Sequence, residues 1–434
     1  MARIYHTADW HVGKSLGKVS RREDHVAVLA EIVEQAREHK PDLIVHSGDV
    51  FDIQLPGQDS QQIAFRALAA LGEIAPVLVI AGNHDPVTAF AGLAYLLGDN
   101  SRVMLLAKPQ HPSQRPLPVY ETTEGERIRV AAVPWIAPNR LVDFFSEGQQ
   151  VASYQEGVRL INAAYATALS EDYNPSRDVL LYVAHEHVTG AIMSGSERAL
   201  QAGEAFQSDA TMIPQVAYGA LGHIHKPQQI GGGPGMYAGA PMQLDFGEAG
   251  EEKSSVLITA EPGRPAVIER LPLTSARPLV QFVGTLEQIA EPFAIPDRAI
   301  LRAIITVDEP TDDLSDKVQA LLPDVTIERA DPMLPGADRA LDPGDTDGET
   351  EPSVEELLGR HLAAQGTKNQ GVKPERVVAV FTQLQAEAAN PGADDGPTAV
   401  TALLTREPPA APHGARPLAV VAAVDDAEDE QAAA

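Results

Sequence analysis

Residues 6–14 read HTADWHVGK, and similar polar clusters return four times further along the chain. They are HSGDVFD at 46–52, AGNHDP at 81–86, a histidine at position 185, and ALGHIHKPQ at 220–228. Most of them follow a short run rich in Val, Ile or Leu, which predicts a buried strand. Ligands of open α/β sheets gather at the carboxyl ends of strands. We therefore expect the five clusters to meet in one site.

The apolar runs and the patterns between them predict a layered α/β domain. The predicted strands are 2–8, 42–47, 76–81, 128–134, 179–184 and 216–221. Two helices are predicted between strands: 22–39, with Val26, Leu29, Ile32 and Val33 on one face, and 60–72, with Ile63, Phe65, Leu68 and Leu71 on one face. Alternation of strands and helices is typical of a sheet covered by helices.

The pattern of apolar and polar residues changes after about residue 275. Two short apolar strands at 279–283 and 299–307 and a helix near 312–322 predict a small α/β unit. A Pro-, Asp- and Gly-rich linker follows at 331–352, and then two predicted helices at 353–364 and 374–389. Ser353 with Glu356 forms a capping-box pattern, and Pro374 suits a first helical turn. The remaining Ala- and Pro-rich residues predict disorder.

Composition excludes several kinds of chemistry. The chain of 434 residues has no cysteine, which rules out disulfides, thiolate metal sites and cysteine nucleophiles, and favours a reducing cytoplasm. We expect no signal peptide and no membrane span, because no basic start precedes an apolar run and no apolar stretch approaches about 18 residues. An apolar content of 44% is ample for a large core.

The polar clusters together supply the ligands that a pair of divalent cations needs. Two cations about 3.5–4 Å apart can activate a water and neutralise charge on a phosphoryl group. Asp9 and His11 are two residues apart, so both side chains can point the same way from a strand end, and His223 with His225 repeats this spacing. Imidazole and carboxylate together suit Mn, Fe or Zn better than Mg. The glycines at 48, 82 and 222 give the backbone room to turn tightly.

These blocks resemble the calcineurin-like metallophosphoesterase superfamily, and their order resembles the SbcD family of bacterial DNA exonuclease subunits. The string YAGAPMQLDFGE at 237–248 adds to the likeness, which covers residues 1–275 well and the remainder less specifically. The resemblance implies a sandwich of two mixed sheets flanked by helices. The domains expected are a metallophosphoesterase nuclease domain at 1–275, a small α/β cap domain at 276–335, a helical docking segment at 350–390, and an acidic disordered tail at 391–434.

The resemblance also implies roles for individual residues. Asp9, His11, Asp49 and His225 are expected to hold the first metal, and Asp49, Asn83, His185 and His223 the second, with Asp49 bridging. His84 is expected beside the scissile phosphate, as a proton donor or a stabiliser of the transition state. Asp85 is expected to orient His84. Asp52 stands where archaeal relatives often have a histidine, and no catalytic role is assigned to it.

Several residues near the clusters have competing interpretations. His187 is a rival to His185 as a ligand, because it lies two residues on and can face the same way. His6 and His46 are expected to be buried or supporting residues, His25 and His39 to lie on helix surfaces, and Trp10 to pack behind the site. Lys14, Arg21, Arg22 and Lys226 either contact DNA phosphates or are solvated.

The resemblance implies an Mn²⁺-dependent nuclease of DNA repair, recombination and replication, with Mg²⁺, Fe²⁺ and Zn²⁺ as other candidate ions. It would act on DNA ends and hairpins as a 3′–5′ double-strand exonuclease and single-strand endonuclease. Its partner would be the SMC-like ATPase SbcC, within a nucleoid-associated heterotetramer that contains a homodimer of this chain. The net charge of −28 is unusual for such an enzyme, and it favours the alternative of a small-molecule phosphoesterase. A non-catalytic DNA tether is a third hypothesis.

Overall fold

The computed structural model describes residues 1–98, 101–137, 144–145, 153–194, 207–231, 233–291, 295–308 and 313–334. The chain divides into two compact units, Met1–Leu341 and Asp342–Ala434. All described residues belong to the first unit. The helical segment predicted at 350–390 and the tail predicted at 391–434 lie outside the described residues.

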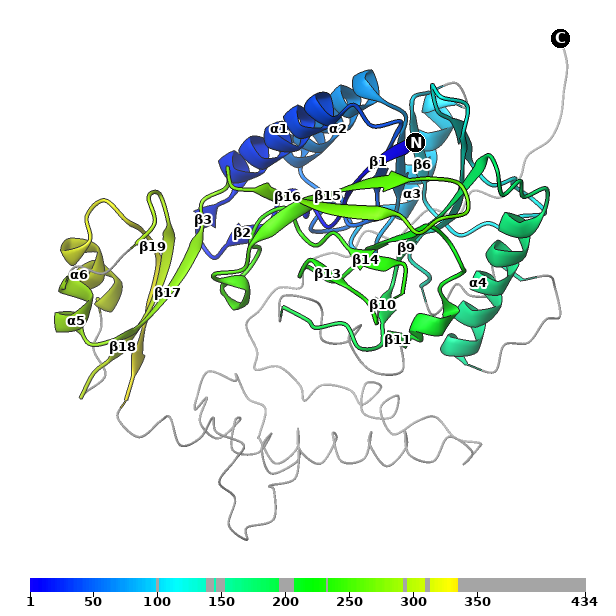
Figure 1. The fold of residues 1–434 in the computed structure, drawn as a ribbon. Coiled ribbons are helices and arrows are strands. Elements are labelled where there is room, and N and C mark those ends of the chain that lie inside the picture. The colour runs from blue at the N-terminus through cyan, green and yellow to red at the C-terminus, as the bar shows by residue number, and fades with distance from the viewer. Residues whose placement is uncertain are drawn as a thin grey trace, which may run out of the picture. The chain divides into compact units, whose positions relative to one another are not determined.

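Two six-stranded mixed sheets make up most of the first unit (Figure 1). The first sheet has the order β16 (Val267–Leu273), β15 (Lys253–Ala260), β1 (Ala2–Thr7), β4 (Leu43–His46), β5 (Val77–Ile80) and β6 (Val103–Leu106). The second has the order β13 (Gln228–Gln229), β14 (Gly235–Tyr237), β12 (Tyr218–Gly222), β9 (Asp178–His185), β8 (Arg127–Val133) and β7 (Val119–Glu121).

In each sheet four neighbouring strands run parallel, and the remaining strands pair antiparallel at the edges. Parallel strands end at the same edge of a sheet, so the polar clusters that follow β1, β4 and β5 are brought together, as are those that follow β9 and β12. The predicted fold of two mixed sheets flanked by helices is confirmed.

Apolar side chains fill three layers around and between the sheets. Ile4, Val45 and Leu78 of the first sheet pack against the second sheet in the central layer. On the outer face of the first sheet lie α1 (Arg22–His39), α2 (Gln58–Ile74) and α3 (Val87–Leu97). On the outer face of the second sheet lies α4 (Tyr154–Ser170). Burying one such aliphatic side chain contributes about 1.5–3 kcal/mol, so these layers supply the main stabilisation.

The predicted buried face of α1 was partly wrong. Val26 is 46% exposed, whereas Val28 and Ala36 are buried beside Leu29 and Ile32. The predicted surface residue His25 is also buried, with 1% of its area exposed. The buried face is shifted toward Val28 because the start of α1 packs against the loop that follows β1. There the ring of His25 contacts the His11 carbonyl oxygen.

A small three-stranded parallel sheet follows the second large sheet in the chain. It consists of β17 (Leu279–Gly284), β18 (Ile300–Thr306) and β19 (Thr326–Met333), with α5 (Leu286–Ala290) and α6 (Leu314–Leu321) packed on one face around Leu301 and Ile305. Thr285 and Gln288 form a capping box at the start of α5. A separate domain at 276–335 stays a prediction, because the compact unit runs on to Leu341.

Short elements complete the described part of the chain. They are the hairpin of β2 (Ser15–Leu16) and β3 (Val19–Ser20), the pair β10 (His187–Val188) and β11 (Gln207–Ser208), and the 3-10 turns η3 (Ala210–Met212) and η4 (Phe246–Glu248). Among the helices described, none combines the length and the apolar composition that a membrane span needs.

Candidate metal centre

The seven expected ligands meet where the two large sheets present their strand ends. Asp9 and His11 follow β1, Asp49 follows β4, and Asn83 follows β5. His185 ends β9, and His223 and His225 follow β12. All seven are buried, with at most 5% of their area exposed.

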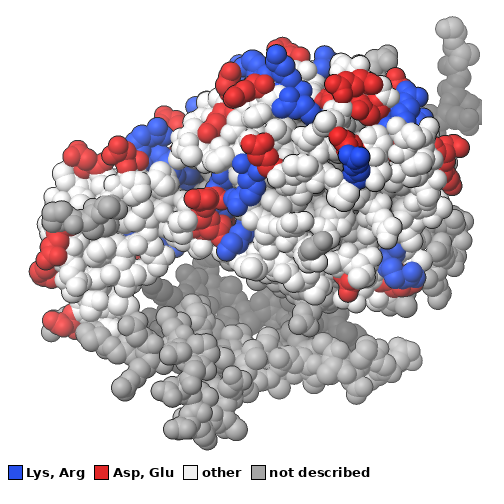
Figure 2. Space-filling view, viewed as in Figure 1, with Lys and Arg blue, Asp and Glu red and all other residues white. Residues whose placement is uncertain are grey.

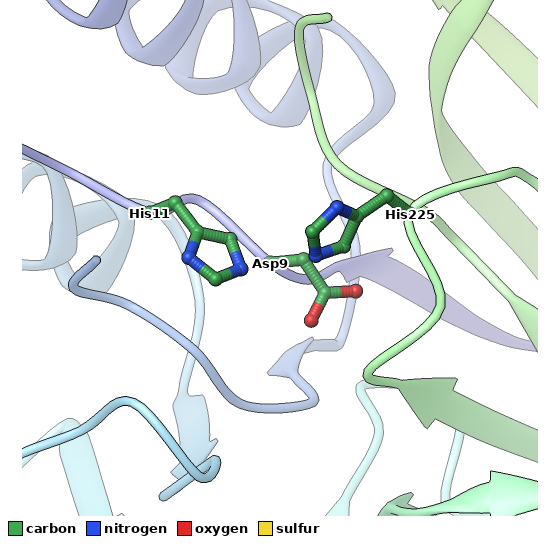
Figure 3. A group of neighbouring side chains, drawn as sticks. All are labelled: Asp9, His11 and His225. Atoms are coloured by element: carbon green, nitrogen blue, oxygen red, sulfur yellow. The ribbon is translucent and has the colours of Figure 1, made fainter. Parts of the chain in front are cut away.

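Asp9, His11 and His225 form the first group, and Figure 3 shows them turned toward one another from two distant segments of the chain. One ligand atom from each lies within 4.8 Å of the other two. Asp9 Oδ1 accepts a hydrogen bond from the His223 backbone amide at 2.9 Å, which ties the first sheet to the second. The other oxygen, Oδ2, is left to face the site.

Asp49 lies between this group and a second one. Its Oδ2 is 3.5 Å from His11 Nε2 and 3.4 Å from His185 Nε2. Its Oδ1 accepts the His84 backbone amide at 2.8 Å, which fixes the carboxylate. One oxygen of Asp49 is therefore placed between a histidine of each group, as a bridging ligand must be.

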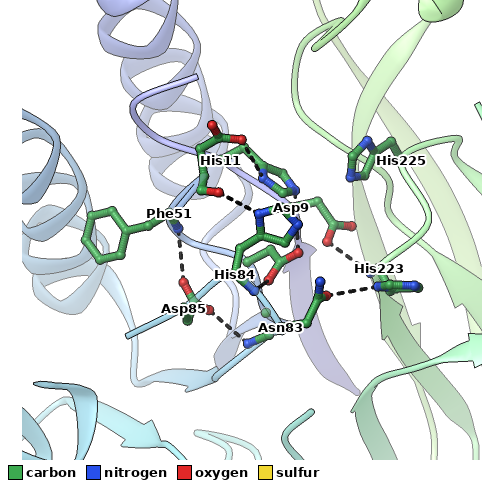
Figure 4. A network of polar contacts seen from close by, with 12 residues as sticks. Asp9, His11, Phe51, Asn83, His84, Asp85, His223 and His225 are labelled. Carbon is green, nitrogen blue, oxygen red and sulfur yellow. Dashed lines mark hydrogen bonds and ion pairs between the residues drawn. The ribbon is translucent and has the colours of Figure 1, made fainter. Parts of the chain in front are cut away.

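Asn83 joins the two histidines of the second group. Its side-chain oxygen is 2.8 Å from His185 Nε2. The same oxygen is 3.0 Å from His223 Nδ1, a contact drawn in Figure 4. The other nitrogen of His185, Nδ1, lies 2.8 Å from the Ser47 carbonyl oxygen. Since a carbonyl oxygen only accepts, it fixes the proton on Nδ1 and leaves Nε2 free to bind a cation.

Close approach of the strand ends requires glycine at two points. A Cβ on Gly48, whose φ is +100°, would lie 2.3 Å from His185 Nδ1. A Cβ on Gly82 would lie 2.1 Å from Asp49 Oδ1. The space that a side chain would fill is thus occupied by the expected ligands themselves.

Four of the expected ligands also have left-handed backbone conformations. The φ angles are 50° at Asp9, 45° at His11, 57° at Asp49 and 101° at His223. Such conformations cost of order 1–3 kcal/mol each for residues other than glycine, and persist where the surrounding structure fixes them. These strained backbone conformations direct the side chains of successive loops toward one point.

The buried carboxylates and imidazoles of the site shift one another's pKa values. Burial raises the pKa of Asp9 to about 7, although His185 and His225 oppose the shift. Burial opposes ionisation of Asp49 too, but His185 and His11 hold the pKa of Asp49 well below its usual range. Burial lowers the pKa of His11 to about 4, so its imidazole is neutral near pH 7, as a metal ligand must be.

Unpartnered buried atoms point to cations at this place. Asp9 Oδ2, His11 Nε2 and His223 Nε2 are buried and have no hydrogen-bond partner among the described residues. Leaving a buried polar atom unsatisfied costs about 1–3 kcal/mol, and more for a charged group. Carboxylate, imidazole and amide oxygen in this set fit two divalent cations of the Mn, Fe or Zn kind.

Comparison with known proteins agrees with this geometry. The family described as calcineurin-like phosphoesterase matches residues 2–227. The chain belongs to the calcineurin-like phosphoesterase family. It is also similar to bacterial proteins named as the SbcD subunit of the nuclease SbcCD.

The relative from Bacillus subtilis (strain 168) is 31% identical over 291 residues, which cover 64% of this chain and 72% of that protein. The Rhodobacter capsulatus protein is 29% identical over 372 residues, covering 77% and 89%. The Escherichia coli (strain K12) protein is 28% identical over 380 residues, covering 83% and 92%. The predicted relationship to the SbcD family is therefore confirmed.

In this phosphoesterase the contacts of His84 and Asp85 correct one expectation. Asp85 does not form the expected pair with the His84 ring in the contacts described: its oxygens accept the backbone amides of Phe51 at 3.0 Å and Gly82 at 2.8 Å. His84 Nδ1 instead lies 2.5 Å from the Asp52 carbonyl oxygen (Figure 4). Asp85 therefore fixes the loops that follow β4 and β5 relative to each other, because its buried carboxylate binds backbone amides of both.

Asp52, to which the sequence assigned no catalytic role, belongs to the site of the phosphoesterase. Its carboxylate oxygen Oδ1 lies 3.5 Å from His11 Nδ1 and 3.5 Å from Lys14 Nζ. One ligand atom from each of His11, Asp52 and His84 lies within 4.8 Å of the others. Asp52 thus supports His11 with its carboxylate and His84 with its carbonyl.

Three further supporting residues were missed in the sequence. Glu248 Oε1 lies 3.2 Å from His225 Nδ1, His25 Nε2 lies 2.9 Å from the His11 carbonyl oxygen, and Trp135 stacks on His223 with ring centroids 5.4 Å apart. Of these three, only Glu248 could have been found from the sequence, since it ends the family-like string at 237–248.

Of the other residues that the sequence singled out, some lie where they were predicted and one does not. His6, His46 and Trp10 are buried. His187 is buried too, with its ring centroid 6.0 Å from that of His223, and its rivalry with His185 stays a prediction. Arg21 is buried and pairs with Asp24, so it is not available to a DNA phosphate. Lys14, Arg22 and Lys226 keep side chains that are at least partly exposed, and their role on DNA stays a prediction.

Proposed function

We propose that this chain is the nuclease subunit of an SbcCD-type complex, and that it hydrolyses DNA phosphodiesters with two divalent cations, of which Mn²⁺ is the expected ion. The observation that carries the proposal is Asp49, placed between His11 and His185 at the meeting point of two ligand groups. The name of the relatives, which calls them a subunit of the nuclease SbcCD, supports a nucleic acid as the substrate.

The proposed ligands divide between two cations. Asp9, His11 and His225 would hold the first, Asn83, His185 and His223 the second, and Asp49 both. Bound cations would activate a water and neutralise negative charge on the phosphoryl oxygens. Each carboxylate keeps one oxygen on a backbone amide, so the ligand set is held in place before a cation binds.

His84 is proposed to act on the leaving oxygen. The Asp52 carbonyl can only accept, so it holds a proton on His84 Nδ1. In the protonated ring the second proton is then on Nε2, from which it can be donated. His84 is half-buried, unlike the fully enclosed ligands, so it borders the space that a substrate reaches.

The negative charge of the chain bears on the choice of substrate. On the described residues of the face drawn in Figure 2, Lys and Arg are interspersed with Asp and Glu rather than gathered into a basic patch. DNA binding then depends on the cations, on other surfaces, or on a basic partner. The same charge of −28 favours the second candidate function, a phosphoesterase that acts on a phosphomonoester or cyclic nucleotide.

A partner ATPase of the SbcC kind is proposed to bind the segment 350–390, for which the sequence predicts helices. A homodimer of this chain is also proposed, within the same complex. We place the complex at the nucleoid in the cytoplasm, acting on DNA ends and hairpins.

The decisive experiment incubates the full chain, alone and with the ATPase partner, with Mn²⁺ and end-labelled duplex, hairpin and single-stranded DNA. Cleavage is expected for all three, with 3′–5′ polarity on the duplex. His84→Gln should abolish cleavage and leave Mn²⁺ binding unchanged, which excludes a tether that binds metal only for stability. His39→Gln, on the surface of α1, is the matched control and should cut normally.

Two results would contradict the proposal. The metal-loaded, partner-bound protein could leave every DNA substrate intact, which removes the nuclease. Alternatively, a chromogenic phosphate ester could be turned over far faster than DNA is cut, which favours the small-molecule enzyme.

A further inference from the structure

We propose that the small sheet β17–β19 controls the affinity of the first metal site, through contacts that end on His225 and His11. The inference rests on the proposed two-metal function. It assigns positioning roles to Phe246 and Arg302, neither of which is an expected ligand. The two histidines belong to one group with Asp9, so a shift that reaches both acts on one cation.

The first route runs through the short turn η4. Phe246 is 3% exposed and packs with Leu279 and Ile300, which begin two strands of the small sheet. The Arg302 guanidinium carbon of the same sheet lies 4.4 Å from the centre of the Phe246 ring. Glu248, at the other end of this three-residue turn, is 3.2 Å from His225 Nδ1. The turn therefore contacts the small sheet at one end and an expected ligand at the other.

Glu248 is held tightly enough to transmit a displacement. Its Oε2 lies 2.6 Å from Lys253 Nζ and accepts the Leu244 backbone amide at 3.1 Å. Lys253 also donates to the His225 carbonyl oxygen at 3.1 Å. The ring and the backbone of His225 are thus each held by one member of an ion pair, and a movement of η4 displaces Glu248, the member that contacts the ring.

The second route begins at Arg277, two residues before β17. Its backbone amide donates to Asp24 Oδ1 at 2.9 Å, and its guanidinium pairs with the same carboxylate. Asp24 also pairs with buried Arg21 at 2.6 Å. The next residue of α1, His25, lies with its ring nitrogens 2.9 Å from the carbonyl oxygens of Arg21 and His11.

The other metal group is supported from within the large sheets. His185 is positioned by the Ser47 carbonyl, which follows β4, at 2.8 Å. His223 stacks on Trp135, whose backbone amide donates to Ala81, after β5, at 2.8 Å. A disturbance of the small sheet should therefore reach the first group and spare the second.

The test measures Mn²⁺ binding to the full chain by calorimetry and by electron paramagnetic resonance, which distinguishes a coupled ion pair from an isolated ion. Arg302→Met removes the cation above Phe246 and keeps the aliphatic stem. We expect one of two binding steps to weaken by at least about threefold, less than the about 10–100-fold that loss of a direct supporting partner of a ligand costs. Glu248→Gln, which alters such a partner, should reach about tenfold.

Matched variants separate positioning from general damage. Arg329→Met changes an exposed arginine of the same sheet, paired with Asp331, and should bind both ions as the wild type does. Arg302→Lys retains a cation near the ring and should restore most of the lost affinity. Phe246→Leu tests the same route from the other side, in case Arg302→Met folds poorly.

Each result decides between the alternatives. Selective weakening of one step, with a rise of the isolated-ion signal, supports the proposal. Equal weakening of both steps, or no weakening in Arg302→Met, Phe246→Leu and Glu248→Gln, overturns it while the two-metal function stands. A wild-type chain that binds no Mn²⁺ overturns both.

Discussion

A methyl group at position 82 should disable the site, because Gly82 lies directly against Asp49. In Gly82→Ala the added Cβ would lie 2.1 Å from Asp49 Oδ1 and 2.4 Å from the Asp49 backbone nitrogen, where ordinary contacts begin at 3.4 Å. One of the contacts is with backbone, so a change of rotamer cannot relieve it. The loops after β4 and β5 must separate by about 1 Å, and a misplacement of this size can cost about 100-fold in rate.

The cost in stability should be of similar size to the loss of activity, since a loss of rate of about 100-fold corresponds to about 2.7 kcal/mol. Inserting a methyl group into a packed interior typically costs about 1–3 kcal/mol. Gly92→Ala is the matched control, since nothing lies within 4 Å of the Cβ that it adds on α3. Alanine in a helix is more favourable than glycine by about 1 kcal/mol, so this variant should be slightly stabilised and fully active.

Both variants are compared by thermal unfolding without metal, by Mn²⁺ titration, and by Mn²⁺-dependent cleavage of a labelled duplex. Gly82→Ala should remain folded, bind Mn²⁺ weakly and cut about 100-fold more slowly. Wild-type cutting by Gly82→Ala would refute the reasoning, because it would mean that the spacing of the two loops is not a requirement of the site.

Three further predictions concern charge, pH and metal. Asp52→Asn removes the carboxylate beside His11 Nδ1 and should weaken Mn²⁺ binding or activity by about tenfold. The control Asp59→Asn, on α2, should change neither. Equal Mn²⁺ binding by the wild type and both variants would show that Asp52 does not support the site. Burial lowers the pKa of His6 from 6.5 to about 3, so the unfolded chain takes up this proton first, and His6 should lower the stability by about 2 kcal/mol as the pH drops from 6.5 to 5. Thermal unfolding of the metal-free protein between pH 7 and pH 5 measures this slope, which His6→Gln should reduce; an unchanged slope would assign it elsewhere. Mn²⁺ at about 100 times its dissociation constant should stabilise the wild type by about 2.7 kcal/mol per site, and a chelator should reverse the rise in melting temperature.

Local sequence determined the strands and the positions of the chemistry. The apolar runs predicted β1, β4, β5, β8, β9 and β12 to within two residues at each end, because a strand buried on both faces leaves an uninterrupted apolar signature. The glycine at position 82 was also readable, since a turn packed against a ligand leaves no room for a side chain. Strands with charged residues, such as β16 and β19, escaped prediction because their exposed faces interrupt the pattern.

Only the tertiary structure decided which polar groups meet. Asp85 binds two backbone amides instead of the adjacent His84 ring, and Glu248 reaches His225 from 23 residues away. His25 is buried on a helix whose pattern placed it outside. Local periodicity reports how apolar a face is, but the partner of a buried polar atom depends on the segment that packs over it. That segment is chosen by the order of strands in the two sheets, which no local pattern records.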